Sequence, residues 1–440
     1  MHIRVKKILK WAAGLIAVFA IGVFALIGFQ STTRGTPVER VIAIGKDGAP
    51  PPVDDSLFAR TMELFTGAHL DATNSVELME NGNGTYPRLW KDILGAQHSL
   101  TVQMYYSQPG AVADTMQKYL MDRARHGVRV LLLMDAFGSG PLKKEREQWE
   151  DPLRAAGVSV AWLRPMHWWN LNKTNFRSHV RVVVVDGHVG WTGGFGLADY
   201  WLGDGRHEDQ WRETNARFQG PTVMELQGMF AAGWAEATGD LLAGGQFFPR
   251  TGWDSAGTTA AGMFYALPTT GSTNAERMMA LSIASARRTL YVTNSYFVPD
   301  DDFRRLLIDA AHRGVDVRVL TAGDKGDVKT TIYAGRARYD ELLKEGIKIY
   351  EYQPTMIHAK SFVVDGMWST VGSLNFDNRS LAFNNESNIL VLDRGFGAQM
   401  DTSFVHDLQY AKQITPAQRR SIGFGEKLLE AGANALSRML

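Results

Sequence analysis

The pattern of hydrophobic and polar residues along the chain contains the same series of predicted elements twice. In each copy, an apolar-rich run typical of a β-strand leads to a helical pattern that ends in a glycine, and then to a second strand-like run. Gly127 and Gly314 are the two terminal glycines. The predicted elements are strands at 99–106 and 128–134 around a helix at 113–126, and strands at 289–296 and 315–321 around a helix at 301–312. This alternation predicts an α/β fold of two similar halves, each a β-sheet flanked by helices.

The N-terminal segment shows neither the strand pattern nor the amphipathic helix pattern of the two copies. Residues 11–29 form an uncharged, largely apolar run that is about long enough to cross a bilayer as a helix. Four basic residues precede it and sparser ones follow, which favours a cytoplasmic N-terminus and an extracytoplasmic body. A cleaved signal peptide is the competing interpretation, but the run is long and no clear cleavage site closes it. We therefore expect a single N-terminal pass in the bacterial inner membrane.

These patterns divide the chain into five parts. The glycine-rich stretch at 239–262 lies between the two copies and is the natural seam. The expected parts are a membrane anchor or uncleaved signal at 1–30, a tether at 31–72, a first half at 73–240, a second half at 263–413 and a C-terminal helix at 414–440.

One short chemical motif is present in both halves. His179, Arg181 and Asp186 have the same spacing as His358, Lys360 and Asp365. The same kinds of residue follow each copy in the same order: Gly193, Gly194 and Glu213 after the first, and Gly372, Ser373, Asn375 and Glu386 after the second. A repeat of this kind indicates a duplicated half-domain in which each half carries one half-site.

Strand geometry suggests what the motif does. In a strand, His179 and Arg181 would share one face, as would His358 and Lys360, while the aspartates would point the other way. An imidazole can act as a nucleophile or a general acid, and a neighbouring cation can hold an anionic oxygen. Two such half-sites facing each other are suited to a two-step displacement at a phosphodiester.

The paired motifs resemble the signature of the phospholipase D superfamily, H-x-K-x4-D followed by Gly-Gly or Gly-Ser and an asparagine. Their flanks are most similar to bacterial cardiolipin synthase-like members, over roughly residues 76–412. The resemblance implies two halves packed with the active site between them, a covalent phosphohistidine intermediate, and neither metal nor other cofactor. Carried over, it makes His179 the nucleophile, His358 the general acid and base, and Glu213 and Glu386 the orienting carboxylates. It also implies that Arg181, Lys360, Ser373 and Asn375 bind the substrate phosphate, and that Asp186, Asp365, Gly193, Gly194 and Gly372 are structural.

The first motif departs from the signature at two positions. Arg181 stands where the family has lysine, and Gly196 where it usually has asparagine. Arginine keeps the charge and offers phosphate a bidentate fork, but it is larger and does not change protonation state. One alternative is that the first half has lost its function. Because His179, Asp186 and Glu213 all survive in it, we expect an active enzyme instead.

Composition narrows the possible partners. The 440 residues carry a net charge of +1, which is not typical of proteins that bind nucleic acid, so no nucleic-acid partner is expected. The chain has no cysteine, which excludes disulfides and thiolate metal sites. The expected partners are a membrane and a phospholipid substrate, phosphatidylglycerol or a related lipid.

Two stretches are candidates for contact with lipid, and each has an alternative. Residues 166–171 contain the adjacent Trp168 and Trp169, which suit either a membrane interface or a buried aromatic cluster. Residues 421–440 place apolar side chains near one helical face, as in a helix that lies on a membrane. For this second stretch we expect packing on the body instead, because most amphipathic helices cover a core.

The function expected from motif, anchor and resemblance is that of a membrane-anchored phosphatidyltransferase, a cardiolipin synthase that uses phosphatidylglycerol. Three alternatives share these features: a phospholipase D hydrolase, a membrane-tethered nuclease that uses the same histidines, and a non-catalytic protein that binds anionic lipid.

Overall fold

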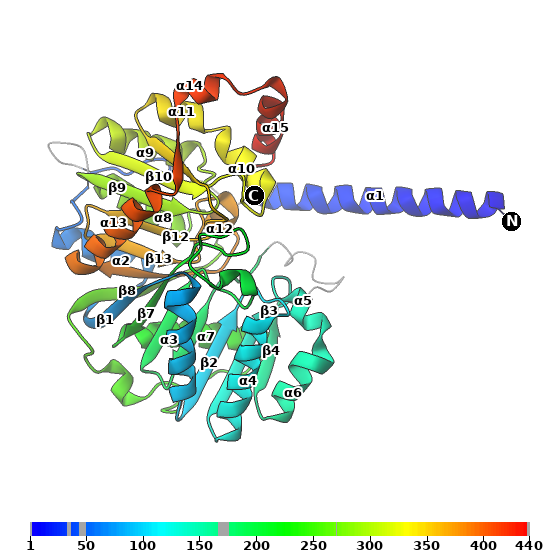
Figure 1. Cartoon of the computed structure of the whole chain (residues 1–440), viewed down its shortest axis with the longest axis vertical. Helices are drawn as coiled ribbons and strands as arrows, with labels where there is room; N and C mark the ends of the chain where they lie inside the picture. The colour runs from blue at the N-terminus through cyan, green and yellow to red at the C-terminus, as the bar shows by residue number, and fades with distance from the viewer. Residues whose placement is uncertain (1, 33–36, 44–49, 166–175, 270, 438–440) are drawn as a thin grey trace.

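The computed structural model describes residues 2–32, 37–43, 50–165, 176–269 and 271–437. At the N-terminus, α1 (His2–Thr32) is a single helix that extends away from the body (Figure 1). Within these ranges, no helix is both long enough and apolar enough to cross a membrane.

The body is built on one long hydrogen-bonded succession of strands. The strands of the first half are β1 (Asp71–Glu80), β2 (Ser99–Met104), β3 (Arg129–Asp135), β4 (Ser159–Leu163), β5 (Val182–Val185), β6 (Val189–Gly193) and β7 (Thr214–Gln219). Those of the second half are β8 (Thr259–Ala266), β9 (Thr289–Asn294), β10 (Asp316–Ala322), β11 (Lys348–Tyr352), β12 (Lys360–Val364), β13 (Trp368–Gly372), β14 (Glu386–Leu392) and β15 (Ala411–Ile414). The order is β4-β3-β2-β5-β6-β7-β1 in the first half and continues as β8-β14-β13-β12-β9-β10-β11-β15 in the second. Apart from the additional edge strand β15, the second half repeats the first in mirror order around the β1–β8 pair.

Helices cover the strands in matching positions of the two halves. They are α3 (Asn81–Gly95), α4 (Ala111–Arg125) and α7 (Thr222–Thr238) in the first half, and α8 (Asn274–Ser285), α9 (Asp301–His312) and α13 (Arg394–Leu408) in the second. In the first half, α3 and α4 cover the face of β5 that bears Val183 and Val185, while α7 covers the face that bears Val182 and Val184. Figure 1 shows helices on both sides of the strands, as this division requires.

The two halves share part of their core. Val182 and Phe218 of the first half belong to the same buried apolar cluster as Val371 and Ile389 of the second. Packing of this kind fixes the relative position of the halves, because buried interfaces in proteins are close-packed. The α/β fold of two similar halves predicted from the sequence is confirmed.

The structure confirms the strand–helix–strand repeats. The first is β2, α4 and β3, and the second is β9, α9 and β10, each within a few residues of its expected limits. The glycines after the two helices have left-handed backbones, with φ of 87° at Gly127 and 90° at Gly314, which explains why glycine stands at both positions.

Several limits differ from those expected. Residues 56–66, inside the predicted tether, form α2 (Ser56–Thr66), because Phe58 and Met62 at helical spacing are buried against the second half. The first half begins with β1 at Asp71 and the second with β8 at Thr259, ahead of residues 73 and 263. The tryptophan pair at 168–169 lies outside the described residues.

The C-terminal region differs from the prediction in two respects. It contains two helices, α14 (Pro416–Arg420) and α15 (Phe424–Ala435), where a single helix was expected. The expected packing of the apolar face of the longer helix on the body is wrong, since Leu428 and Leu429 are exposed. The body binds the polar face of α15 instead, through charged side chains.

Candidate active site

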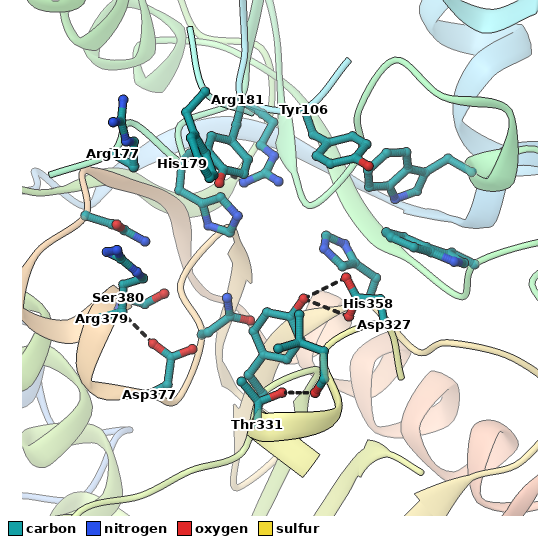
Figure 2. A pocket seen from close by; sticks show the side chains of 18 residues that line it. Tyr106, Arg177, His179, Arg181, Asp327, Thr331, His358, Asp377, Arg379 and Ser380 are labelled. Atoms are coloured by element: carbon teal, nitrogen blue, oxygen red, sulfur yellow. Dashed lines mark hydrogen bonds between the residues drawn. The ribbon is translucent and has the colours of Figure 1, made fainter. Parts of the chain in front are cut away.

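A cavity of about 480 Å³ lies between the two halves. Its walls carry both motif histidines, and Figure 2 shows His179 and His358 projecting into it from opposite sides. Around them, the lining is made of Tyr105, Tyr106, Phe137, Arg177, Arg181, Trp201 and Trp211 from the first half, and of Tyr296, Asp327, Val328, Thr331, Asn375, Asp377, Arg379, Ser380 and Asn384 from the second. The fold therefore brings the two half-sites together in one pocket.

Each histidine is held by the backbone of the opposite half. The His179 N–H donates to the carbonyl oxygen of Asn385 at 2.8 Å, just before β14. In the same way, the His358 N–H donates to the carbonyl oxygen of Arg212 at 2.7 Å, just before β7. These bonds place each imidazole beside the start of a strand that belongs to the other half.

The carboxylates that contact the imidazoles are also exchanged between halves. Glu386 Oε2 lies 2.9 Å from His179 Nδ1, and Glu213 Oε2 lies 2.6 Å from His358 Nδ1. A carboxylate only accepts hydrogen bonds, so this pairing assigns the Nδ1 proton to each ring. The Nε2 atom of each imidazole is then free of the carboxylate and available to the cavity.

Burial keeps both imidazoles neutral. It lowers the pKa of His179 to about 4, assisted by the charge of Arg181 and opposed by Glu386. Burial also lowers the pKa of His358 well below its usual range, and the charges of Lys360 and Arg181 act in the same direction. A neutral imidazole with a free Nε2 lone pair can act as a nucleophile or as a base.

The two cations of the motifs are buried next to the histidines. Arg181 donates to the carbonyl oxygen of His179, and its guanidinium lies 5.4 Å from the ring centre of Tyr105. Lys360 donates to the carbonyl oxygen of His358. Burial lowers the pKa of Lys360 to about 7, with Glu213 opposing the shift and Arg181 adding to it.

The motif aspartates bind backbone groups at a distance from the pocket. The Asp186 carboxylate accepts from the backbone N–H groups of Gln97, His98 and Ser99 at 2.7–2.8 Å. Asp365 accepts from the three equivalent N–H groups in the second half, those of Arg287, Arg288 and Thr289, at 2.7–3.0 Å. The aspartates thus tie the end of each motif strand to the start of the neighbouring strand, β2 or β9.

Comparison with known proteins agrees with the site geometry. The family model "Cardiolipin synthase, PLD-like domain" matches residues 89–234 and 279–408, one match in each half. The chain belongs to this family. It is 31% identical to cardiolipin synthase of Geobacillus kaustophilus over 85% of this chain and 74% of that protein. It is also 31% identical to cardiolipin synthase A of Pseudomonas putida strain KT2440, over 91% of this chain and 84% of the relative.

Solved structures support the phospholipase D-like fold at lower identity. The phosphatidylserine synthase of Haemophilus influenzae has a TM-score of 0.64 and 12% identity, covering 87% of this chain and all of that one. A polyphosphate kinase from Porphyromonas gingivalis has a TM-score of 0.53 and 11% identity, covering 78% of this chain and 49% of the kinase. At such identities the likeness concerns the fold alone.

The two phospholipase D-like halves hold their glutamates in different ways. In the second half, the Ser373 hydroxyl donates to Glu386 Oε2 at 2.5 Å. In the first half, Gly194 has no hydroxyl, and Trp201 Nε1 donates to Glu213 Oε2 at 3.1 Å instead. The tryptophan therefore takes the place of the missing serine.

The same tryptophan accounts for Gly196. A Cβ atom at this position would lie 2.7 Å from the Trp201 ring and 2.8 Å from the carbonyl oxygen of Tyr106. No larger side chain fits while Trp201 occupies this space. Glycine at position 196 therefore makes room for Trp201, which still holds the Glu213 carboxylate.

The four expected phosphate ligands differ in the contacts that they make. Arg181 and Asn375 line it, and the Asn375 side-chain oxygen accepts from the Ser295 hydroxyl at 3.1 Å. The Ser373 hydroxyl donates to Glu386 at 2.5 Å, and its contact with the substrate phosphate stays a prediction. Lys360 donates to the carbonyl oxygen of His358, and its contact with phosphate also stays a prediction. Gly193 and Gly372 end β6 and β13, where they shape the backbone.

Aromatic contacts to the histidines were not assigned from the sequence. Trp211 stacks on His358 with ring centres 5.0 Å apart, and Trp201 meets the same imidazole edge to face at 5.3 Å. Tyr105 meets His179 edge to face at 4.6 Å. Tyr105 and Tyr296 occupy matching places at strand ends in the sequence, which favours a position in the cavity wall for both, whereas Trp201 and Trp211 have no equivalent in the second half. Among the described residues, no group of three or more histidine or carboxylate side chains is arranged to hold a metal ion.

Proposed function

We propose that the protein is a phosphatidyltransferase of the phospholipase D type that makes cardiolipin from phosphatidylglycerol through a phosphohistidine. One observation carries the proposal: two imidazoles face one cavity from opposite halves, and each is oriented by a glutamate of the other half. Such an arrangement suits in-line attack at a phosphorus atom placed between them. The curated relatives named cardiolipin synthase support the choice of lipid.

The first chemical step forms a covalent bond to His179. Its Nε2 attacks the phosphorus of one phosphatidylglycerol, and the bond from phosphorus to the glycerol headgroup oxygen breaks. His358 donates a proton to that oxygen, so glycerol leaves and the phosphatidyl group remains on His179. Glu386 balances the positive charge that develops on the His179 ring.

The second step transfers the phosphatidyl group. His358, now neutral, accepts a proton from a headgroup hydroxyl of a second phosphatidylglycerol, and the resulting oxygen nucleophile attacks the phosphorus. The phosphorus–nitrogen bond breaks, which restores His179 and releases cardiolipin. Water in place of the second lipid would give a hydrolase, so transfer requires that the acceptor lipid outcompete water in the cavity.

Binding of the substrate favours the protonated form of His358 that the first step needs, with the proton taken from solvent. Burial and two cations favour a neutral His358. An anionic phosphodiester between the histidines opposes this shift, because a negative charge stabilises the imidazolium form. Binding of the lipid and protonation of the acid are therefore coupled.

The proposed location is the bacterial inner membrane, with residues 11–29 crossing it and the body outside the cytoplasm. The support is the complete sequence of this run, which contains no charged residue and follows Arg4, Lys6, Lys7 and Lys10. Trp11, Phe19 and Phe24 of α1 are exposed, so they have no partner in the body that would compete with lipid.

The function can be tested with vesicles that contain phosphatidylglycerol labelled in the glycerol headgroup and in the acyl chains. We expect released glycerol and acyl-labelled cardiolipin in equal amounts, and neither product from the His179→Ala variant. Phosphatidic acid as the main product would show a hydrolase. Cleavage of an oligonucleotide added to the same reaction would show a nuclease, and lipid binding without any product would show a non-catalytic protein.

A further inference from the structure

The C-terminal helix α15 binds the body through its polar face. Glu430 is buried, and its carboxylate accepts from both terminal nitrogens of Arg419 at 2.7 and 2.8 Å. One turn further on, the Asn434 side-chain oxygen accepts from Arg338 at 2.5 Å. These ionic and polar contacts fix the rotation of the helix about its axis.

That rotation leaves the apolar face of α15 uncovered. Phe424 is 83% exposed, Leu428 63%, Leu429 55% and Leu436, just after the helix, 47%. Their spacing places them on one side of the helix, within a sector of roughly 140° at 100° per residue. Amphipathic helices of water-soluble domains normally bury this side, and here its orientation is reversed.

The helix also adjoins the wall of the catalytic cavity. It packs on α10 (Lys329–Arg336), where Ala433 contacts Ala334. Thr331, near the start of α10, lines the cavity, as does Val328 immediately before it. The eight residues of α10 span about 12 Å, so α15, which packs on this helix, lies close to the cavity. In Figure 1, α15 lies at the side of the body from which α1 extends.

We propose that the apolar face of α15, formed by Phe424, Leu428, Leu429 and Leu436, lies in a lipid bilayer at the boundary between headgroups and acyl chains. A lipid surface fits this face better than a protein partner because α15 lies at the side of the body from which α1 extends (Figure 1) and packs on α10, which borders a cavity whose proposed substrate is a membrane lipid. Lys427 is exposed beside it and can pair with anionic headgroups. The helix would thus hold the mouth of the cavity against the membrane. The choice of a lipid surface and the position at the cavity mouth both rest in part on the proposed function.

The contact with lipid can be measured without any catalytic assay. Because the chain has no cysteine, Leu428→Cys places a single thiol on this face for an environment-sensitive fluorophore. The matched control is Gln399→Cys, at an exposed position on α13. Both full-length proteins are reconstituted into vesicles of phosphatidylethanolamine and phosphatidylglycerol, with or without bromine on the acyl chains.

We expect brominated lipid to quench most of the emission from position 428 and little of that from position 399. Equal, weak quenching at both positions would overturn the proposal. A blue-shifted emission at 428 that brominated lipid does not quench would also overturn it, since the face would then be covered by protein.

A second variant separates docking from chemistry. Replacing both Leu428 and Leu429 by serine should lower turnover of vesicle phosphatidylglycerol about tenfold, because several buried methylene groups are lost from the lipid contact. Turnover of a short-chain phosphatidylglycerol dissolved as monomers should not change. Equal loss on both substrates would show that α15 does not act at a lipid surface. If no substrate is turned over by any form, the proposed function fails, while the quenching result still decides the position of α15.

Discussion

At the scale of single residues, the two histidines differ in what the proposed reaction asks of them. His179 must form a bond to phosphorus, whereas His358 must give and take a proton. Both rings are buried and both contact a carboxylate through Nδ1, so their resting geometry is nearly the same. Their roles therefore become distinguishable when the leaving group changes.

Replacing His358 by alanine should lower turnover of phosphatidylglycerol at least about a hundredfold, because general acid catalysis is lost. A phosphodiester with a nitrophenol leaving group does not need that proton, so the same variant should still release one equivalent of nitrophenol in a rapid burst. His179→Ala should show no burst with either substrate. A burst from His179→Ala together with none from His358→Ala would mean that the two roles are reversed.

Lys360 should set the alkaline limit of activity. Its pKa is lowered to about 7, so it carries its charge below this pH and loses it above. If this charge stabilises the transferring phosphate, turnover should fall as the pH rises through about 7. Lys360→Arg keeps the charge and should move the decline to higher pH, as measured by the pH dependence of kcat/KM, which reports the pKa values of the free enzyme. Identical alkaline limbs in the two forms would exclude this role.

At the scale of secondary-structure elements, the strand that follows each histidine is less important for its orientation than the strand facing it. His179 precedes β5 but depends on Glu386 at the start of β14, while His358 precedes β12 and depends on Glu213 just before β7. Any change that displaces one of these glutamates should therefore impair the histidine of the other half.

Gly194→Ala tests this dependence. A Cβ at position 194 would overlap the carboxylate of Glu213, and moving that carboxylate would release His358. We expect turnover to fall at least about tenfold, since positional errors in active sites are costly. The matched control is Gly228→Ala in α7, where the added Cβ meets no heavy atom within 4 Å. It should leave turnover unchanged and stabilise the fold by up to about 1 kcal/mol, measured by thermal unfolding. Full activity in Gly194→Ala would contradict the proposed route from Glu213 to His358.

At the scale of the whole molecule, sidedness decides which leaflet supplies the substrate. A cysteine introduced at Gly48, which lies outside the described residues, would follow the proposed membrane segment in the chain. We expect it to react with a membrane-impermeant maleimide in intact spheroplasts, because the basic residues before the apolar run favour a cytoplasmic N-terminus. The control, His2→Cys at the other end of α1, should react only after lysis. The opposite pattern would place the body in the cytoplasm.

The local features of this protein were predictable from its sequence. The strand–helix–strand repeats, the terminal glycines and the pairing of His179 with His358 all follow from periodicities that extend over a few residues or from a repeated motif. Buried and exposed positions alternate with a fixed period in a strand and with a different one in a helix, so the order of apolar and polar side chains identifies the element and the face that it buries.

Only the tertiary structure decided which groups meet across the halves. Each histidine and its glutamate are separated by 207 or 145 positions in the chain, so no local pattern records that they pair crosswise. Trp201 replaces a serine hydroxyl because it packs into space that Gly196 leaves open. The orientation of α15 depends in the same way on Arg419, which binds the polar face of the helix. Periodicity shows that a helix has an apolar face, but the position of its partners on α14 and on the body decides which face is left exposed.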